Sequence, residues 1–516
     1  MPWWRDAVVY EIYVRSFADG NGDGVGDLPG IRARLPYLAD LGVDAVWLTP
    51  FYRSPMADGG YDVADYRDVD PLFGDLRDFD ALVAEAHRLG LRVIVDVVPN
   101  HSSSEHPWFK QALAAGPGSP ERERYIFRPG SPEPPNDWRS VFGGPAWSRS
   151  PDGEWYLHLF APEQPDFNWR NPEVHEEFAQ VLRFWLDRGV DGFRIDVAMG
   201  LYKRQGLPSV GDPALMSRHS GLPFWGQPET HGVYRDWRRV LDSYEGDRVA
   251  VGEVWTDSAE DLARYVRPDE LHQTFNFRWL EAPWSAEASR RIITETLDEV
   301  PSPTWVLSNH DVVRHLSRYG NAARARAALL AMLSLPGSAY LYQGEELGLP
   351  EVKDLPPEAR QDPIFERSKG ELAGRDGCRV PLPWSGAEPP FGFSPAGVAP
   401  WLPQPAAWSA LTAEAQATDP GSTLSFYRRA LALRRAFRDR LPDGIRWLDT
   451  GDEDLLAFTR GDLTCAVNYG SHPAPLPPGA PVLTSAPVPA ATLPPDTAAW
   501  LATGDLATAL SRPGSP

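Results

Sequence analysis

The sequence predicts an α/β protein: a (β/α)8 TIM barrel with a small domain inserted after its third strand and a C-terminal antiparallel β-sandwich. Two observations lead to this fold class. Short apolar runs rich in β-branched residues alternate with amphipathic helical patterns along most of the 516 residues. Eight such runs precede a change of pattern near the C-terminus, and a strand–helix alternation that repeats to eight strands is typical of a parallel barrel.

The eight predicted strands follow one another along the chain. They are VVYEIYV at 8–14, AVWLTP at 45–50, RVIVDVVP at 92–99, GFRIDV at 192–197, VAVGEVW at 249–255, QTFNF at 273–277, TWVLSNHD at 304–311 and SAYLYQG at 338–344. Two intervening segments, 79–90 and 176–189, place apolar residues at three- and four-residue spacing and end in glycine, as amphipathic helices do. We expect helices of this kind to cover the outside of the barrel.

Two further domains are predicted from changes in composition. Segment 101–170 is rich in Pro, Gly, Trp and Ser and is too long to hold a single helix, so we interpret it as a domain inserted in the barrel. The barrel then comprises 1–100 and 171–441, and a helix at 422–441 closes it. Beyond it, short alternating runs with prolines and no helical period predict the small β-sandwich at 442–516.

Charge and composition limit the kinds of partner. The formal net charge of −21 disfavours nucleic acid or an anionic membrane as a partner, because both would repel the protein. No stretch approaches the roughly 18 apolar residues of a membrane span, and the N-terminus lacks the pattern of a signal peptide. Cys378 and Cys465 are expected to stay reduced. We therefore expect a cytoplasmic protein that acts on a neutral or cationic small molecule, in an oligomeric state that the sequence leaves open.

Charged side chains stand at the ends of several predicted strands, where barrel enzymes carry their active sites. Asp96, Asp196, Glu253 and Asp311 are embedded in apolar runs at such ends. One acid there would suggest a salt bridge or a helix cap, but several at equivalent positions favour chemistry. Glycoside hydrolysis needs two carboxylates, and a third can stabilise its cationic transition state. Arg194 shares a strand face with Asp196 and is expected to keep that carboxyl ionised.

The sequence resembles a known family at four places. DVVPNH (96–101), GFRIDVA (192–198), GEVW (252–255) and SNHD (308–311) resemble the four signature regions of the α-amylase family of glycoside hydrolases. The resemblance implies that Asp196 is the nucleophile, Glu253 the general acid/base and Asp311 the stabiliser of the transition state. It also implies that His101 and His310 contact the sugar, supported by Asp96 and Arg194. The reaction would be a double displacement with retention of configuration.

Three further motifs resemble the α-glucosidase and oligo-1,6-glucosidase branch of this family. QPDFN (164–168) is similar to the branch signature QPDLN and places Gln164 in the sugar site. DGGY supplies Asp58 and Tyr61, and GRDGCRVPLPW supplies Arg375. The resemblance implies that Asp58 and Arg375 close the pocket behind a terminal glucose and bind its hydroxyls, while Tyr61 stacks on the ring. The alternative is an ordinary loop salt bridge between Asp58 and Arg375.

The preferred linkage is less constrained. Within the family, valine directly after the nucleophile tends to accompany α-1,6 activity, which Val197 would favour, whereas GFRIDVAxGL resembles α-glucosidases that act on maltose-like sugars. Met199 fills a variable position and leaves the acceptor side open. We expect a retaining, exo-acting α-glucosidase for short α-1,4-linked substrates. The alternatives are an oligo-1,6-glucosidase, or a transglucosidase or sugar isomerase with the same triad. A non-catalytic relative is disfavoured, because such relatives tend to lose the catalytic acids.

The loop DGNGDGVGD at 19–27 resembles the first part of an EF-hand loop. Oxygen ligands fall at alternating positions: Asp19, Asn21, Asp23, the carbonyl of Val25, and Asp27. The loop lacks the glutamate at position twelve of an EF-hand. The pattern predicts a structural Ca²⁺ or Mg²⁺, the alternative being a Gly/Asp-rich turn without metal, and no organic cofactor is expected.

Overall fold

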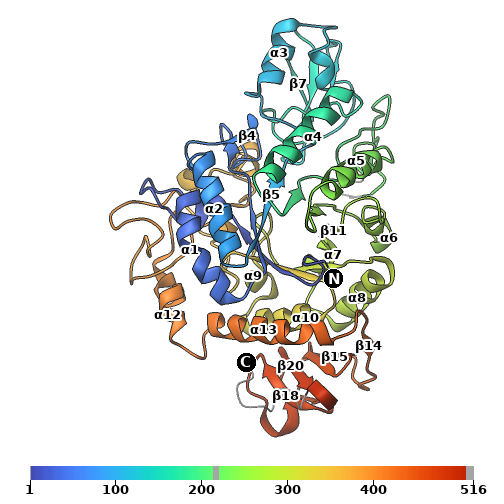
Figure 1. Cartoon of the computed structure of the whole chain (residues 1–516). Coiled ribbons are helices and arrows are strands. Elements are labelled where there is room, and N and C mark those ends of the chain that lie inside the picture. Colours follow the sequence, from blue (N-terminus) through green and yellow to red (C-terminus); the bar gives the residue numbers. More distant parts are fainter. Residues whose placement is uncertain (1, 213–219, 507–516) are drawn as a thin grey trace.

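The computed structural model describes residues 2–212 and 220–506 (Figure 1). Its centre is an eight-stranded parallel sheet that curves into a barrel, with strand order β11-β10-β9-β5-β2-β1-β13-β12. The strands are β1 (Val8–Ile12), β2 (Ala45–Leu48), β5 (Arg92–Val97), β9 (Gly192–Ile195), β10 (Val249–Gly252), β11 (Gln273–Thr274), β12 (Thr304–Val306) and β13 (Ser338–Tyr342). The edge strands β11 and β12 meet where the Thr304 hydroxyl donates to the Thr274 carbonyl. The predicted TIM barrel is confirmed.

Helices cover the outside of the barrel, as the sequence predicted (Figure 1). The longer ones are α1 (Leu28–Leu41), α2 (Leu76–Arg88), α4 (Pro172–Asp187), α5 (Thr230–Asp242), α8 (Ala286–Glu299), α10 (Ala322–Ser334) and α13 (Thr423–Phe437). Shorter helices are α6 (Ala259–Ala263), α7 (Phe277–Leu280), α9 (His315–Tyr319), α11 (Pro363–Arg367) and α12 (Ala413–Ala417). Local sequence sets their ends: Asp75 and Asp78 form a reciprocal capping box at the start of α2, and α1 stops at Gly42, whose φ of 98° suits glycine.

The side chains that point into the barrel change from apolar to charged along strands β1 and β5. On β1, Val9 belongs to the apolar cluster that fills the barrel. Glu11 is the next residue on the same face, because strand side chains alternate with a period of two. Ile94 and Asp96 repeat this order on β5. Apolar side chains therefore fill the lower barrel, and charged side chains occupy its C-terminal end.

A small subdomain is inserted between β5 and α4 and projects above the barrel (Figure 1). It contains α3 (Pro107–Ala115) and an antiparallel sheet with order β6-β8-β7, formed by β6 (Phe127–Arg128), β8 (Trp155–Leu157) and β7 (Trp147–Arg149). A short hairpin, β3 (Tyr52–Arg53) and β4 (Asp65–Val69), precedes it in the chain. These elements of the insert fall within 101–170, and the exact limits of that segment stay a prediction.

The C-terminal strands are antiparallel, as predicted, and lie on the barrel side formed by α10 and α13 (Figure 1). One sheet has the order β14-β15-β16-β20-β18 and a second pairs β17 with β19. The strands are β14 (Arg446–Trp447), β15 (Leu455–Arg460), β16 (Leu463–Asn468), β17 (Ala474–Pro475), β18 (Ala480–Thr484), β19 (Thr492–Leu493) and β20 (Thr497–Ala502). The Trp500 indole of β20 donates to the Leu330 carbonyl of α10 at 3.0 Å and attaches the sheet to the barrel.

All eight barrel strands end before the predicted runs do, and two of these differences have a consequence for the structure that follows. QTFNF yields only Gln273–Thr274, because the Asn276 side chain accepts the Trp279 amide and starts α7 at Phe277. TWVLSNHD leaves the strand after Val306, so that Asp311 lies on a loop. Within the described ranges, no helix has both the length and the apolar character that crossing a bilayer requires.

Candidate active site

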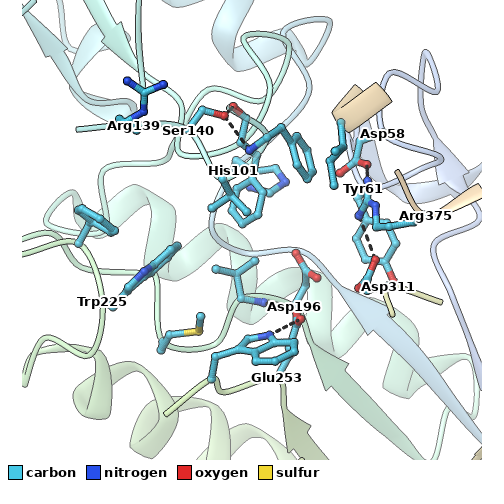
Figure 2. Close-up of a pocket in the computed structure, with 18 of the residues that line it drawn as sticks. Asp58, Tyr61, His101, Arg139, Ser140, Asp196, Trp225, Glu253, Asp311 and Arg375 are labelled. Atoms are coloured by element: carbon cyan, nitrogen blue, oxygen red, sulfur yellow. Dashed lines mark hydrogen bonds and ion pairs between the residues drawn. The ribbon is translucent and has the colours of Figure 1, made fainter. Parts of the chain in front are cut away.

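A cavity of about 770 Å³ opens where the C-terminal ends of the strands meet the inserted subdomain (Figure 2). Its inner wall carries most of the predicted site residues: Asp58, Tyr61, His101, Asp196, Glu253, Asp311 and Arg375. Three others, Gln164, Arg194 and His310, lie behind this wall and are almost fully buried. The structure thus brings together every residue that the sequence predicted for catalysis and sugar binding.

Arg194 is the centre of the charged network. One of its terminal nitrogens, Nη1, lies 2.9 Å from Asp96 Oδ1 and 2.7 Å from Asp196 Oδ1. The other, Nη2, lies 2.7 Å from Glu253 Oε2. Because one guanidinium group contacts both Asp196 and Glu253, these two carboxyl groups are held close together. Only 2% of Arg194 is exposed, so its contacts are largely shielded from solvent.

Glu253 receives two more hydrogen bonds from its own side of the cavity. The Val197 amide donates to Oε2 at 3.0 Å, and the Trp255 indole donates to Oε1 at 3.1 Å (Figure 2). Val197 has a φ of 45°, which is strained for a β-branched residue. The strained backbone therefore aims an amide at the carboxyl group that follows the neighbouring strand.

The protonation of Asp196 differs from the expectation. Burial raises the pKa of Asp196 well above its usual range, and although Arg194 lowers it, the nearby Glu253 raises it further. The prediction that Arg194 keeps Asp196 ionised is therefore wrong for the free enzyme, because the opposing effects of burial and of Glu253 outweigh the effect of Arg194. Burial also raises the pKa of Asp96 to about 7, against the opposing effect of Arg194. Burial and the neighbouring acids therefore favour the neutral form of Asp196, against the effect of Arg194.

Asp311 has the opposite protonation. Burial alone would raise its pKa, but His310, Arg375 and Arg379 together bring that pKa below the usual range. Its Oδ1 accepts hydrogen bonds of 2.9 Å from both Arg375 and Arg379. Asp311 is therefore a fixed anion in a cavity that otherwise favours neutral acids.

Arg375 joins three acids at the inner end of the cavity, two of which, Asp58 and Asp311, are labelled in Figure 2. Its guanidinium contacts Asp58 at 2.6 Å, Asp311 at 2.9 Å and Asp362 at 2.6 Å. Gln164 completes the end wall, since its amide nitrogen lies 3.0 Å from Asp58 Oδ2. This arrangement is more than an isolated loop salt bridge, because one cation holds carboxylates from three separate segments.

The two histidines occupy different positions. His101 lines the cavity, and its Nε2 lies 3.0 Å from the amide nitrogen of Gln164. Burial lowers the pKa of His101 to about 3, so the ring is neutral. His310 lies deeper and stacks on Tyr61, with ring centroids 5.2 Å apart and planes at 7°. One face of Tyr61 is therefore covered by His310.

The outer part of the cavity is apolar. Val141, Phe142, Phe224, Trp225, Met199 and Ile364 line it. Val141 is 55% exposed. It is one of three large hydrophobic residues that are exposed within residues 2–212 and 220–506. Clusters of exposed apolar side chains are typical of binding sites. The cavity therefore has a charged inner end and a mainly apolar mouth, although Arg139, Ser140 and Glu281 also line the cavity.

The predicted metal loop at 19–27 directly precedes α1 and does not line the cavity. Both carboxylate oxygens of Asp19 accept backbone amides of the loop, and Asp27 accepts loop amides and caps α1. Among the described residues, no three His, Cys, Asp or Glu side chains gather closely enough to hold a metal ion. The carboxylates are thus directed at amides, and a cation at this loop stays a prediction.

Comparison with known proteins identifies the family. The catalytic domain of alpha amylase matches residues 11–441. The chain belongs to the α-amylase family. The chain is 42% identical over 491 residues to a probable alpha-glucosidase of Rhizobium meliloti (strain 1021). The aligned region covers 89% of this chain and 87% of that protein. It is 38% identical over 476 residues to the oligo-1,6-glucosidase of Parageobacillus thermoglucosidasius, covering 84% of each.

Solved structures agree with this assignment. The α-glucosyl transfer enzyme XgtA superposes with a TM-score of 0.88 at 39% identity, covering 97% of this chain and 100% of that chain. The protein is therefore a glycoside hydrolase of the α-amylase family, as the four sequence motifs predicted.

The sequence analysis missed several residues of the site. Arg379 and Asp362 fix the anion Asp311 and the cation Arg375, yet both come from irregular segments that carry no periodic pattern. Glu11, which contacts His310, did have a signal: it is a charged residue inside the apolar run VVYEIYV. The same kind of signal identified Arg194 and could have identified Glu11.

Proposed function

We propose that the enzyme is a retaining, exo-acting α-glucosidase that releases α-D-glucose from the non-reducing end of short α-1,4-linked gluco-oligosaccharides such as maltose. The observation that supports this most is the end wall, where Arg375 joins Asp58, Asp311 and Asp362. A long chain cannot pass through such a wall, so only a terminal sugar reaches the acids behind it.

Asp196 and Glu253 carry the chemistry in this proposal. Asp196 attacks the anomeric carbon, while Glu253 protonates the leaving oxygen and later activates water. Their shared contact with Arg194 supports the short carboxyl spacing of a double displacement, because an inverting enzyme needs room for a water between the acids. The first step requires Asp196 as the carboxylate and Glu253 as the acid. Asp311 stabilises the oxocarbenium-like transition state as a fixed anion.

The other inner residues bind the terminal glucose. Asp58 and Arg375 accept from and donate to its hydroxyl groups in charge-assisted hydrogen bonds. The free face of Tyr61 stacks on the sugar ring, and His101 and His310 contact its hydroxyls. Gln164 orients Asp58 and His101, since its amide nitrogen lies 3.0 Å from each.

The apolar mouth receives the leaving group or an acceptor. Val197 and Met199 line this side, and their contacts decide linkage preference. The α-1,6 alternative follows from Val197 and from similarity to an oligo-1,6-glucosidase. Transfer to a sugar acceptor is the second alternative, supported by similarity to an α-glucosyl transfer enzyme.

The decisive experiment measures initial glucose release from maltose, isomaltose, trehalose and sucrose at equal concentration, with product anomers followed by NMR. Early α-glucose from maltose supports the proposal, and β-glucose would contradict retention. Preference for isomaltose would identify an oligo-1,6-glucosidase, and accumulation of longer or isomerised sugars would identify a transferase or isomerase. Asp196→Asn provides the control for contaminating activity.

Two subsidiary proposals complete the picture. We place the enzyme in the cytoplasm, supported by its two free, buried cysteines, Cys378 and Cys465. We also propose one structural Ca²⁺ or Mg²⁺ at the 19–27 loop, held by the oxygens of Asp19, Asn21, Asp23, Val25 and Asp27.

A further inference from the structure

A buried acid on β1 contacts a histidine of the catalytic centre. Glu11 is 1% exposed, and its Oε1 lies 2.5 Å from His310 Nδ1 and accepts the His310 backbone amide at 3.3 Å. The imidazole is stacked between Tyr13 and Tyr61, with centroid distances of 5.7 and 5.2 Å. The ring is therefore fixed, and each of its nitrogens faces one defined neighbour.

The second ring nitrogen faces an anion. His310 Nε2 has no hydrogen-bond partner within the described residues, and its charged neighbour is Asp311 Oδ2 at 3.3 Å. Asp311 is ionised, because His310 and two arginines hold its pKa below the usual range. A bare nitrogen lone pair at this distance would repel the carboxylate, so Nε2 must carry the hydrogen.

The hydrogen on Nε2 fixes the state of Glu11. A neutral imidazole has one N–H, so Nδ1 is then an acceptor and its neighbour must be a donor, which requires a protonated Glu11 carboxyl group. An imidazolium beside a Glu11 carboxylate holds the same number of protons. In either form, the pair retains one proton that a separate glutamate and histidine would release at neutral pH.

The surroundings agree with a retained proton. Burial raises the pKa of Glu11 well above its usual range. Arg194 of β9 opposes this shift, and Asp311 and Asp96 of β5 reinforce it. Tyr342 on the neighbouring strand β13 also interacts with Glu11. Burial lowers the pKa of His310, an effect that Asp311 opposes and Arg379, Arg194 and Arg375 reinforce.

We propose that Glu11 is a positioning residue: by sharing a proton with His310, it holds the ring through Nδ1 and leaves the hydrogen on Nε2, beside Asp311, available to a hydroxyl of the bound sugar. Glu11 acts only through His310, since it does not line the cavity. The sugar contact rests on the proposed function, whereas the proton on Nε2 does not.

Two substitutions separate charge from shape. In Glu11→Gln, the amide donates to Nδ1 and preserves Nε2–H without a titratable proton. In Glu11→Met, a chain of similar length offers no donor, so Nδ1 loses its hydrogen-bond partner and the ring loses the contact that fixes it, while Asp311 still favours the hydrogen on Nε2. We expect the Met variant to lose kcat/KM by about 10-fold or more, the value of a hydrogen bond to a charged group. We expect the Gln variant to recover most of that loss, with its alkaline activity limb shifted to higher pH, because glutamine cannot release the proton.

A spectroscopic measurement tests the proton directly. In ¹⁵N-histidine-labelled enzyme, the His310 signals are assigned by their loss in His310→Asn. We expect a protonated, pyrrole-type Nε2 in all three proteins, and an Nδ1 signal that moves downfield in Glu11→Met alone, because only there does Nδ1 accept no hydrogen bond. If the Met variant does not fold, the wild-type spectrum and the pH profile of the Gln variant still decide.

Two results would overturn the inference: an unprotonated Nε2 in the wild type, or superimposable pH profiles for wild type and Glu11→Gln. Failure of the proposed function is distinguishable from either, since an enzyme with a different sugar preference would still show the proton on Nε2.

Discussion

Two neighbouring barrel strands, β12 and β13, are each followed by a buried acid in opposite surroundings. Asp311 follows β12 and accepts hydrogen bonds from Arg375 and Arg379. Glu345 follows β13 and accepts from neutral groups, the Tyr342 amide at 3.1 Å and the Tyr427 hydroxyl at 3.4 Å. These surroundings bring the pKa of Asp311 below its usual range, while burial raises the pKa of Glu345 to about 8.

The difference shows what turns a strand-end acid into a functional anion. Burial favours the neutral form of both acids, and only nearby cations reverse that preference. The basic side chain within 4.0 Å of Glu345 is His315, and burial lowers the pKa of His315 to about 3, so it stays neutral. We infer that Glu345 is structural. A strand-end position alone is therefore insufficient to identify a catalytic acid.

The largest expected effect concerns the acid that forms a bond to the sugar. Asp196→Asn removes the proposed nucleophile while preserving its shape, and we expect kcat to fall by about 10⁴-fold or more, as for other covalent catalysts. Steady-state kinetics on maltose measures the loss, and circular dichroism checks the fold. Glu345→Gln is the matched control: Glu345 is a strand-end acid that does not line the cavity, so we expect kcat to stay near the wild-type value. Substantial activity in Asp196→Asn would refute the assignment.

The comparison itself predicts the next effect. Asp311→Asn removes the fixed anion but keeps a side chain of the same size, and loss of one electrostatic stabiliser costs about 10²–10³-fold in kcat. We expect KM to change less than kcat, because the charge acts mainly in the cationic transition state. Equal losses of kcat in Asp311→Asn and Glu345→Gln would contradict the proposal that the negative charge of Asp311 distinguishes it from Glu345.

A pH effect on stability tests the other side of the comparison. Because the folded pKa of Glu345, about 8, exceeds its unfolded value, the native state holds a proton that the unfolded state releases. This stabilisation is complete below about pH 4, near the unfolded pKa of glutamate, and is lost as the pH rises through 8.

We therefore expect the wild-type Tm to fall from pH 5 to pH 8 by more than the Tm of Glu345→Gln, which has no such proton. Differential scanning calorimetry measures both differences. Glu358→Gln, at an exposed position, is the control and should follow the wild type. A steeper fall in Glu345→Gln than in the wild type would contradict the sign of the effect.

The barrel and its acids could be predicted because both follow regular patterns. Period-two alternation places Arg194 and Asp196 on one strand face, and their contact at 2.7 Å confirms that expectation. The contact of Arg194 with Glu253 could not be derived, because it depends on how adjacent strands stagger as the barrel curves. The protonation of Asp196 was predicted wrongly because Arg194 also contacts Asp96 and Glu253, and these contacts could not be derived from the sequence.

Irregular segments carried the rest of the site. Arg379 and Asp362 lie on loops after β13, where no period relates sequence distance to spatial distance. Val141 in the inserted subdomain lines the mouth, but a single exposed valine has no sequence signal of its own. Glu11 is different, because a charged residue inside the apolar run VVYEIYV is a signal that the sequence does contain. Its period-two position predicts that it lies on the same strand face as Val9.

The smallest expected effect concerns a third class of carboxylate, in the 19–27 loop, whose partners are backbone amides. We expect EDTA to lower the Tm, by about 1 °C for each kcal/mol of stabilisation lost in a protein of this size, and Ca²⁺ or Mg²⁺ to restore it without changing kcat. Asp23→Asn tests the site itself: its Oδ1 accepts the Val25 amide at 2.9 Å, a bond that asparagine retains while losing the charge. The variant should keep the Tm of the EDTA-treated enzyme and respond less to Ca²⁺. A Tm that neither EDTA nor added cation changes would mean that the loop amides alone neutralise these carboxylates.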